Sequence, residues 1–217
     1  MDLAKDCLDV GLYTDRYDEM RAFYCDRLGL PYEELLKAGR GVHQHRVGLH
    51  GSVLKINASR EPLEEARSNF VRLEIAGELY EMMQDPDGTH VWTRQDLDTI
   101  AIHWQSSDPE RLAVLLRDGF DAVQVDGNRW KVGTTTLALQ PNGKPMGSMR
   151  ARGFRYLTVQ VRDVRKEHAH LLSLGWTEGT APIRLGDTAF ISFVLDPDGA
   201  PIEISQRASL TGPLPDV

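Results

Sequence analysis

Glu203 is the residue whose setting most strongly predicts chemistry, because it lies between two isoleucines in the segment Ile202-Glu203-Ile204. Side chains alternate between the two faces of a β-strand, so the isoleucines take one face and the glutamate takes the opposite, inward one. A carboxylate inside a protein is costly unless something pairs with it. Glu203 is therefore predicted either to act at a site, as a metal ligand or general base, or to form a structural ion pair with a buried arginine.

Histidines supply the other candidate ligands. His103 lies in the segment 99–105, where a shift of one residue decides whether its imidazole points inward or outward. His43 and His45 alternate along a second segment and share one face, as a zinc-binding pair requires. The structural alternative for His103 is a strand histidine that forms hydrogen bonds and binds no metal. The alternative for His43 and His45 is a position on a polar cavity wall or on a solvent-exposed face.

Uncharged side chains are candidates for substrate contacts. Tyr156 and Gln160 alternate with apolar residues, which predicts that both line a cavity. Tyr156 can donate a hydrogen bond or a proton to a substrate oxygen, or it can pack against the opposite wall. Trp104 is a candidate cavity aromatic, with core packing as its alternative.

A recurring pattern of elements must position these residues. The tetrad Asp85-Pro86-Asp87-Gly88 returns as Asp196-Pro197-Asp198-Gly199, and each copy precedes an alternating segment, 89–95 or 200–206. Proline presets φ and glycine frees it, as a tight turn before a strand requires. Helices are expected at 17–28, 108–117 and 164–174, each preceded by one strand and followed by several. The other strands are expected at 10–14, 32–36, 42–49, 52–57, 70–76, 99–105, 122–125, 129–132, 135–140, 154–162, 183–185 and 189–195.

This pattern predicts three full βαβββ units and, at 69–95, one shortened unit. The chain is then expected to divide into two halves and a tail. Residues 5–96 hold one full and one shortened unit, residues 97–207 hold two full units, and residues 208–217 form the tail.

Composition narrows the function classes. The 217 residues include 25 Lys and Arg against 32 Asp and Glu, a formal charge of -7 that argues against nucleic-acid binding through phosphates. No window approaches 18 apolar residues, so no membrane span is expected, and the absence of a secretory-type start predicts a cytoplasmic protein. Cys7 and Cys25 make neither a disulfide framework nor a zinc cluster. The expected partner is a small-molecule ligand.

The ordered set of units resembles the vicinal oxygen chelate (VOC) superfamily, which includes glyoxalase I, extradiol dioxygenases, bleomycin-resistance proteins and fosfomycin-resistance enzymes. The segments that carry the resemblance are Val10-Gly11-Leu12-Tyr13, Arg21-Ala22-Phe23-Tyr24, Leu28-Gly29-Leu30, Tyr156 to Asp163 and Asp196 to Ile204. The resemblance implies an α+β fold in which curved half-barrel sheets surround a cavity, with helices outside. It says less about the reaction, since one fold hosts many functions.

The resemblance also implies where a metal ion would bind. In metal-bearing relatives the ligands are a residue near the start of a unit's first strand, usually His, and a Glu on its last strand, which leave positions for a chelating substrate. Glu203 matches the glutamate position, and His103 lies two residues beyond the histidine position of the third unit. The remaining equivalent positions depart from the pattern, being Asp9, Ala101, Tyr156 and Trp92.

Two functions follow from these observations. The first is an enzyme acting on a small oxygen-rich or aromatic molecule in the barrel cavity, with glyoxalase- or dioxygenase-like lyase, isomerase or oxygenase chemistry and a divalent metal ion (Fe, Mn or Zn) as candidate cofactor. Its candidate catalytic residues are Glu203 and Tyr156, its metal ligands Glu203 and His103, and its substrate-binding residues Gln160, Trp104, His43 and His45. The alternative is a metal-free protein that binds or sequesters a small molecule, as bleomycin-resistance proteins do. The sequence leaves open whether the halves pair within one chain or across a homodimer.

Overall fold

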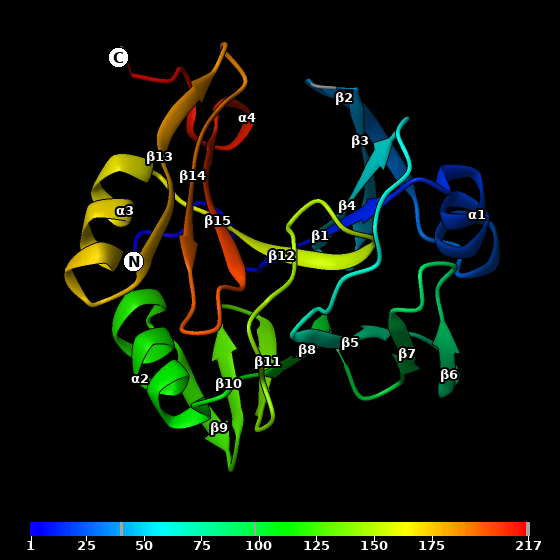
Figure 1. Ribbon diagram of the computed structural model, residues 1–217, viewed down its shortest axis with the longest axis horizontal. Helices are drawn as coiled ribbons and strands as arrows, with labels where there is room; N and C mark the ends of the chain where they lie inside the picture. Colours follow the sequence, from blue (N-terminus) through cyan, green and yellow to red (C-terminus); the bar gives the residue numbers. More distant parts are fainter. Residues whose placement is uncertain (40, 98, 216–217) are drawn as a thin grey trace.

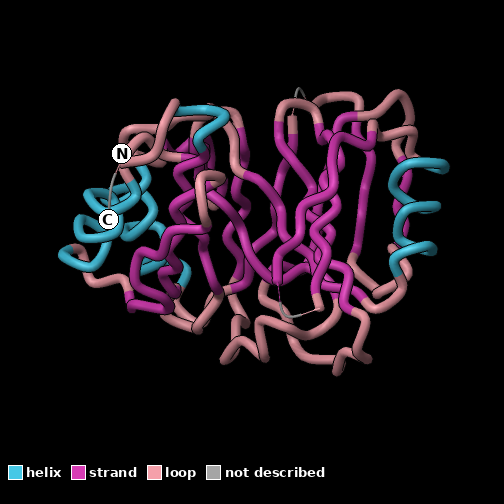
Figure 2. The backbone as a smooth tube through the Cα atoms, turned by 90° about the horizontal axis from the view of Figure 1, so that it is seen from above, coloured by secondary structure: helices cyan, strands magenta, loops and turns pink. Residues whose placement is uncertain are grey.

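The computed structural model describes residues 1–39, 41–97 and 99–215, so the last two residues of the expected tail lie outside the described residues. Two mixed β-sheets lie side by side, and the helices cover their outer sides (Figures 1 and 2). The predicted α+β class with curved sheets and outer helices is confirmed. Among the described residues, no helix combines the length and hydrophobicity needed to cross a membrane.

The elements follow the expected order along the chain. The first group is β1 (Asp9–Thr14), α1 (Tyr17–Arg21) continued by the π-helix η1 (Ala22–Arg27), β2 (Tyr32–Gly39), β3 (Val42–Leu49) and β4 (Ser52–Ser59). The shortened group is β5 (Phe70–Ala76), β6 (Glu81–Gln84) and β7 (His90–Arg94). The third is β8 (Ile100–Gln105), α2 (Pro109–Phe120), β9 (Val123–Asp126), β10 (Arg129–Val132) and β11 (Thr135–Gln140). The fourth is β12 (Gly153–Gln160), α3 (Val164–Ser173), β13 (Thr177–Leu185), β14 (Ala189–Leu195) and β15 (Pro201–Arg207), followed by the short α4 (Ala208–Thr211).

Each sheet combines two of the four groups: the first with the fourth, and the second with the third. The 8-stranded sheet has the order β13-β14-β15-β12-β1-β4-β3-β2 and unites the first and fourth groups, whereas the 7-stranded sheet, β6-β7-β5-β8-β11-β10-β9, unites the second and third. The two groups of the 8-stranded sheet join where β1 pairs antiparallel with β12. Each sheet thus takes one group from each expected half of the chain, and β1, the first strand of the first group, becomes the neighbour of β12, the first strand of the fourth group.

Helix α2 shows both a correct and an incorrect prediction. Asp108 caps its N-terminus by accepting a hydrogen bond from the backbone N–H of Arg111 (2.9 Å), and Pro109 opens the first turn, as expected. The helix was expected to end by Arg117, before Gly119, but it continues to Phe120. The left-handed residue that ends the helix is Asp121 (φ 51°), so Gly119 lies inside the last turn. A Cβ on Gly119 would be 2.6 Å from Leu171 Cδ2, so the glycine permits close packing against α3.

The two Asp-Pro-Asp-Gly tetrads are turns that anchor the strands after them. Oδ1 of Asp85 accepts hydrogen bonds from the backbone N–H groups two and four residues later (3.0 and 2.8 Å), and Oδ1 of Asp196 does the same (2.8 and 2.7 Å). The second oxygen accepts a hydrogen bond from the Tyr24 hydroxyl in the first turn and from Trp104 Nε1 in the second. Burial raises the pKa of both aspartates to about 6. These turns are structural devices that fix how β7 and β15 enter their sheets.

Candidate functional site

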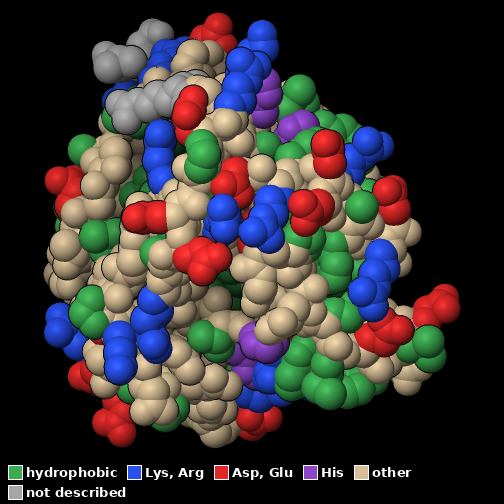
Figure 3. Space-filling model, turned by 45° about the vertical axis from the view of Figure 1, so that its right-hand side comes forward, with side chains coloured by type: hydrophobic (Ala, Val, Ile, Leu, Met, Phe, Trp, Pro, Cys, Tyr) green, Lys and Arg blue, Asp and Glu red, His purple; other side chains and the backbone are tan. Residues whose placement is uncertain are grey.

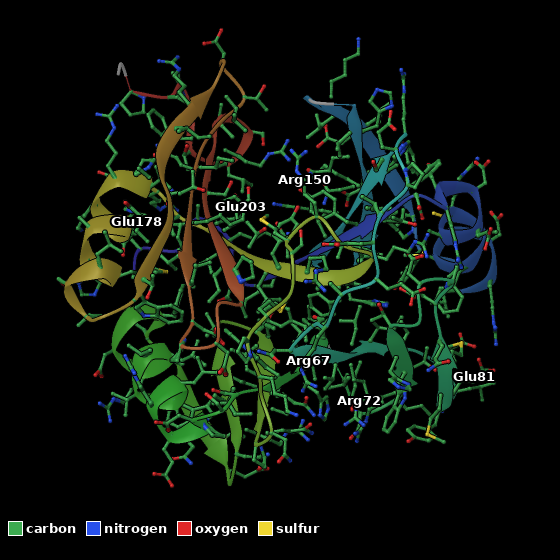
Figure 4. The ribbon with its side chains drawn as sticks, viewed as in Figure 1. Arg67, Arg72, Glu81, Arg150, Glu178 and Glu203 are labelled. Carbon is green, nitrogen blue, oxygen red and sulfur yellow. The ribbon has the colours of Figure 1, made fainter. Side chains whose placement is uncertain are left out.

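One face of the 8-stranded sheet is apolar and the other is polar. The apolar face is fully buried in the core and includes Val10, Leu12, Leu54, Ile56, Leu157, Val159, Ile202 and Ile204. The opposite face, called here the inner face, carries polar side chains from six adjacent strands: Glu34, Arg46, Lys55, Asn57, Asp9, Tyr13, Tyr156, Thr158, Gln160 and Glu203. In Figure 4, Glu203 projects into the space between strands β13–β15 and strands β2–β4. The predicted inward orientation of Glu203 is therefore observed.

Glu203 is one half of a buried ion pair. Its Oε2 lies 2.7 Å from Nζ of Lys55, which comes from β4 at the other end of the chain, and it accepts a hydrogen bond from the Thr158 hydroxyl at 2.7 Å. Lys55 also donates to that hydroxyl, so the three groups form a closed triangle. Lys55 is 3% exposed and Glu203 7%. Of the two predicted roles, the ion pair is present in the structure, but the cation is a lysine and not an arginine.

Tyr156 lies flat across β1 because residue 11 has no side chain. A Cβ on Gly11 would lie 2.1 Å from Cε1 of the tyrosine ring. The Tyr156 hydroxyl accepts a hydrogen bond from Nδ2 of Asn57 (3.0 Å), and Nζ of Lys55 lies 5.7 Å from the ring centroid. Burial, with a smaller contribution from Glu203, raises the pKa of Tyr156 well above its ordinary value. The hydroxyl therefore stays protonated at neutral pH.

Gln160 and Asp9 form a second buried contact on the inner face. Nε2 of Gln160 donates to Oδ2 of Asp9 (3.0 Å), whose other oxygen contacts Nζ of Lys5 (2.6 Å) and the backbone N–H of Val53 (3.0 Å). Oε1 of Gln160 is buried and has no hydrogen-bond partner among the described residues. An acceptor without a partner is thus available on this face.

Arg46 and Glu34 lie at the mouth of the inner face. Nε of Arg46 is 3.0 Å from Oε1 of Glu34, and Nη2 of Arg207 on β15 donates to the same oxygen at 3.1 Å. Because β2 and β15 lie on opposite sides of the curved sheet, Glu34 and Arg207 bridge the mouth. Burial, together with repulsion from Arg207, lowers the pKa of the Arg46 guanidinium from its usual high value.

His103 belongs to the other sheet and not to the Glu203 site. On the 7-stranded sheet its Nε2 lies 2.7 Å from Oε1 of Glu74, and Nε2 of Gln140 lies 2.9 Å from its Nδ1. Arg72 and Arg94 pair with the same glutamate at 3.0 and 3.3 Å. Burial alone would raise the pKa of Glu74, but these cations and the His103 hydrogen bond hold it below its ordinary value. The structure does not bring Glu203 and His103 together.

The remaining candidates also lie away from Glu203. The His45 ring stacks on Tyr17 of α1, with centroids 3.7 Å apart, so it lies on the helix-covered face; its strand neighbour Arg46 faces inward. His43 is half-buried on the same face as His45. Trp104 is fully buried in the 7-stranded sheet, where it packs against Phe70.

Sequence reasoning missed Lys55, Asn57, Thr158 and Arg46 as members of the site. A usable signal was present for the first of them. Leu54-Lys55-Ile56 repeats the pattern of Ile202-Glu203-Ile204, with a charged residue between two apolar ones on a last strand. Two such segments of opposite charge, each with an inward side chain, predict a partner for each other.

The side chains present do not fit a divalent metal ion. Within the part of the chain that the structure describes, no group of three or more His, Cys, Asp or Glu side chains is arranged to hold one. The carboxylates of Glu203 and Asp9 already face ammonium groups, at 2.7 and 2.6 Å. A cation bound at Glu203 would have to displace Lys55 and would meet its positive charge, so these side chains disfavour a metal ion at this carboxylate.

Two surface depressions lie outside the inner face. One of about 600 Å³ is lined by Arg16, Arg67, Asp87 and Arg152 among others, and one of about 800 Å³ by Leu30, Leu49, Ile75 and Leu79 among others. Figure 3 shows acidic and basic side chains intermixed over the visible surface. Most inner-face side chains are buried, including Lys55, Thr158 and Glu203, whereas Glu34 at the mouth is 42% exposed.

Comparison with known proteins agrees with this architecture. Glyoxalase I from Zea mays superposes with a TM-score of 0.73 at 13% identity, covering 92% of both chains. A putative dioxygenase from Bacillus subtilis subsp. subtilis str. 168 gives a TM-score of 0.67 at 15% identity, covering 95% of this chain and 85% of the other. At such identities the likeness concerns the fold alone. Among curated proteins, none matches the sequence.

A protein-family model assigns the chain to a superfamily, which the structural neighbours alone cannot do. The model described as Glyoxalase/Bleomycin resistance protein/Dioxygenase superfamily matches residues 8–204, which span all four groups of elements. The resemblance inferred from the repeated units is thereby confirmed, and the chain belongs to the Glyoxalase/Bleomycin resistance protein/Dioxygenase superfamily.

Proposed function

We propose that this protein binds a small polar molecule on the inner face of the 8-stranded sheet, without a metal ion. The observation that carries the proposal is the Lys55–Glu203–Thr158 triangle, because it stands where the family resemblance implies a metal ligand. A lysine ammonium there already compensates the carboxylate charge that a metal would otherwise balance. This favours the binding or sequestration function over the metal-dependent enzyme.

The inner face offers several fixed groups for recognising ligand oxygens. The Lys55 ammonium on β4 is held by Thr158 and Glu203, and the Tyr156 hydroxyl on β12 is held by the Asn57 amide. Donors already ordered by neighbouring groups lose little conformational freedom when a ligand binds. The aromatic rings of Tyr13 and Phe193 flank Tyr156, with centroids 6.3 and 5.9 Å away, and would contact an apolar part of the ligand.

The test combines metal analysis with a binding screen. Untagged protein should contain far less than one equivalent of transition metal, and small oxygen-bearing molecules should shift the NMR signals of the Asn57 side chain and the Thr158 backbone equally with and without a chelator. Glu203→Gln should weaken this binding, whereas Glu81→Gln, at an exposed site on β6, should leave it unchanged. Stoichiometric metal, or binding that appears only after Zn²⁺ or Mn²⁺ is added, would overturn the proposal and favour a metalloenzyme.

A homodimer and a cytoplasmic location stay predictions. Sedimentation velocity of the purified chain tests the first, since a dimer doubles the sedimenting mass.

A further inference from the structure

Two arginines at the mouth of the inner face converge on a single carboxylate oxygen. Nε of Arg46 on β3 and Nη2 of Arg207 at the end of β15 lie 3.0 and 3.1 Å from Oε1 of Glu34. Guanidinium groups are planar forks whose paired N–H donors match the two or three oxygens of a carboxylate or phosphate. Here two forks share one oxygen, so most of their donor capacity is not used by Glu34.

Arg46 is the more unusual of the two arginines because it is almost entirely buried. The residue is 6% exposed, yet its Nε and Nη1 make no hydrogen bond to any described residue, since the 3.0 Å contact with Glu34 lacks hydrogen-bond geometry. Buried polar groups in native proteins nearly always have partners, and an exception points to a missing water, ion or ligand. Nη1 of Arg46 is such an exception.

The charges around the mouth favour an anion. The ion pairs of the inner face and its mouth involve three carboxylates and four cations: Asp9, Glu34 and Glu203 with Lys5, Lys55, Arg46 and Arg207. Arg150, labelled in Figure 4, interacts electrostatically with Tyr13 of the inner face, as Glu203 does. An excess of positive charge within a chain of formal charge -7 concentrates anionic ligands there.

Glu34 itself is poorly held. It lies on β2, the edge strand of the sheet, and its side chain is 42% exposed, while those of Arg46 and Arg207 are 7% and 12% exposed. A half-exposed side chain can turn into water at little cost, whereas the two guanidiniums are fixed by their surroundings. The carboxylate is therefore the mobile member of the trio.

We propose that Arg46 and Arg207 form an oxyanion clamp, which holds the Glu34 carboxylate in the free protein and takes up a carboxylate or phosphate group of the ligand in its place. The inference rests on the proposed small-molecule function and adds the ligand's chemical class. Arg46 and Lys55 are directly paired residues on β3 and β4, so a ligand anchored at the clamp extends toward Lys55 and Glu203. Glu34 acts as an internal competitor for the ligand's anionic group.

The test uses three probes that separate charge from shape. Inorganic phosphate, benzoate and its neutral analogue benzamide are titrated into the full chain by calorimetry, and the NMR signal of Arg46 Nε–H reports contact at the clamp. Benzoate and phosphate should shift this signal and benzamide should not. Benzoate and benzamide share the ring, so the difference between their affinities measures what the carboxylate charge contributes.

Variants at the clamp should act in opposite directions. Arg46→Gln should weaken anion binding tenfold or more, since charge-assisted hydrogen bonds are lost, and Arg46→Lys should recover only part of it because the fork is absent. Glu34→Gln should tighten anion binding about fivefold, since the internal carboxylate no longer competes. Glu33→Gln, at the exposed neighbouring position on β2, and Arg162→Gln, at an exposed arginine, are the matched controls and should change neither.

The outcomes distinguish the two proposals. If benzamide binds as tightly as benzoate and Arg46→Gln has no effect, the clamp is refuted while small-molecule binding on the inner face stands. If neither charged nor neutral probes bind to wild type or to Glu34→Gln, and the wider screen also fails, both proposals fall. Anion binding that is equal in wild type and Glu34→Gln would show that Glu34 does not compete, which also refutes the clamp.

Discussion

Replacing Glu203 by glutamine removes one charge from the buried Lys55–Glu203 pair and nearly preserves the side-chain volume. Glutamine keeps an oxygen that can accept from Thr158, so the main loss is the compensation of the Lys55 ammonium, whose Nζ lies 2.7 Å away. Breaking a buried ion pair by removing one partner costs about 3–5 kcal/mol, because the other charge stays buried. In a chain of this size each kcal/mol lowers the melting temperature by about 2–4 °C, so Glu203→Gln should lower it by roughly 6–20 °C.

A double-mutant cycle separates the pair from its surroundings. Lys55→Met should cost a similar amount, and Lys55→Met with Glu203→Gln should cost clearly less than the sum, since the second change removes the charge that the first left uncompensated. Urea unfolding followed by circular dichroism gives the three free energies. A loss below about 1 kcal/mol for Glu203→Gln, or strictly additive losses in the double variant, would refute the claim that this pair is a coupled buried unit.

Two further predictions concern the packing and titration of neighbouring groups. Gly11→Ala should lower the free energy of unfolding by about 1–3 kcal/mol because its Cβ overlaps the Tyr156 ring, and Tyr156→Ala in the same chain should recover part of this in urea unfolding; equal losses in both backgrounds would contradict the overlap. Burial raises the pKa of Asp85 to about 6 in the folded protein, above its unfolded value, so the stability it contributes is present below about pH 4 and is lost as the pH rises through 6. Relative to Asp85→Asn, the free energy of unfolding of the wild type should therefore fall by up to about 3 kcal/mol between pH 4 and pH 7. Urea unfolding of both proteins at the two pH values measures this change. A difference between the two proteins that stays constant with pH would count against the raised pKa.

Local patterns predicted the elements of this fold well. Strand β5 was expected at 70–76 and is found at Phe70–Ala76, and the helix expected at 17–28 is present as α1 continued by η1. Strand β6 was not expected, because its four residues Glu81–Gln84 are too few for an alternating pattern and three of them are exposed. Hydrophobic periodicity and turn residues are local signals that need several residues to be recognised. They therefore predict the longer helices and strands and miss the shortest strand.

The site was only partly predictable, because its residues come from strands that are far apart in the sequence. Alternation placed Glu203 inward, which the structure bears out, but it could not say which strand lies opposite. His45 and Arg46 are adjacent in sequence and face opposite sides of the sheet, so attention to the histidine missed the residue that faces Glu34. Pairing between distant strands depends on how units assemble, and a single sequence contains no direct record of that assembly.

The joining of the first and last groups in one sheet has a consequence for synthesis on the ribosome. Lys55 and Glu203 are 148 residues apart, and β1 must wait for β12 before that edge is paired. Because loop closure over such distances is slow, the first group spends most of translation with an unpaired strand edge and an uncompensated lysine. The inner face is complete only once β15 (Pro201–Arg207) has been synthesised, so its two parts join in a late event that requires nearly the whole polypeptide. Nascent chains arrested before β12 should therefore expose β1 to chaperones or to the same strand of another copy.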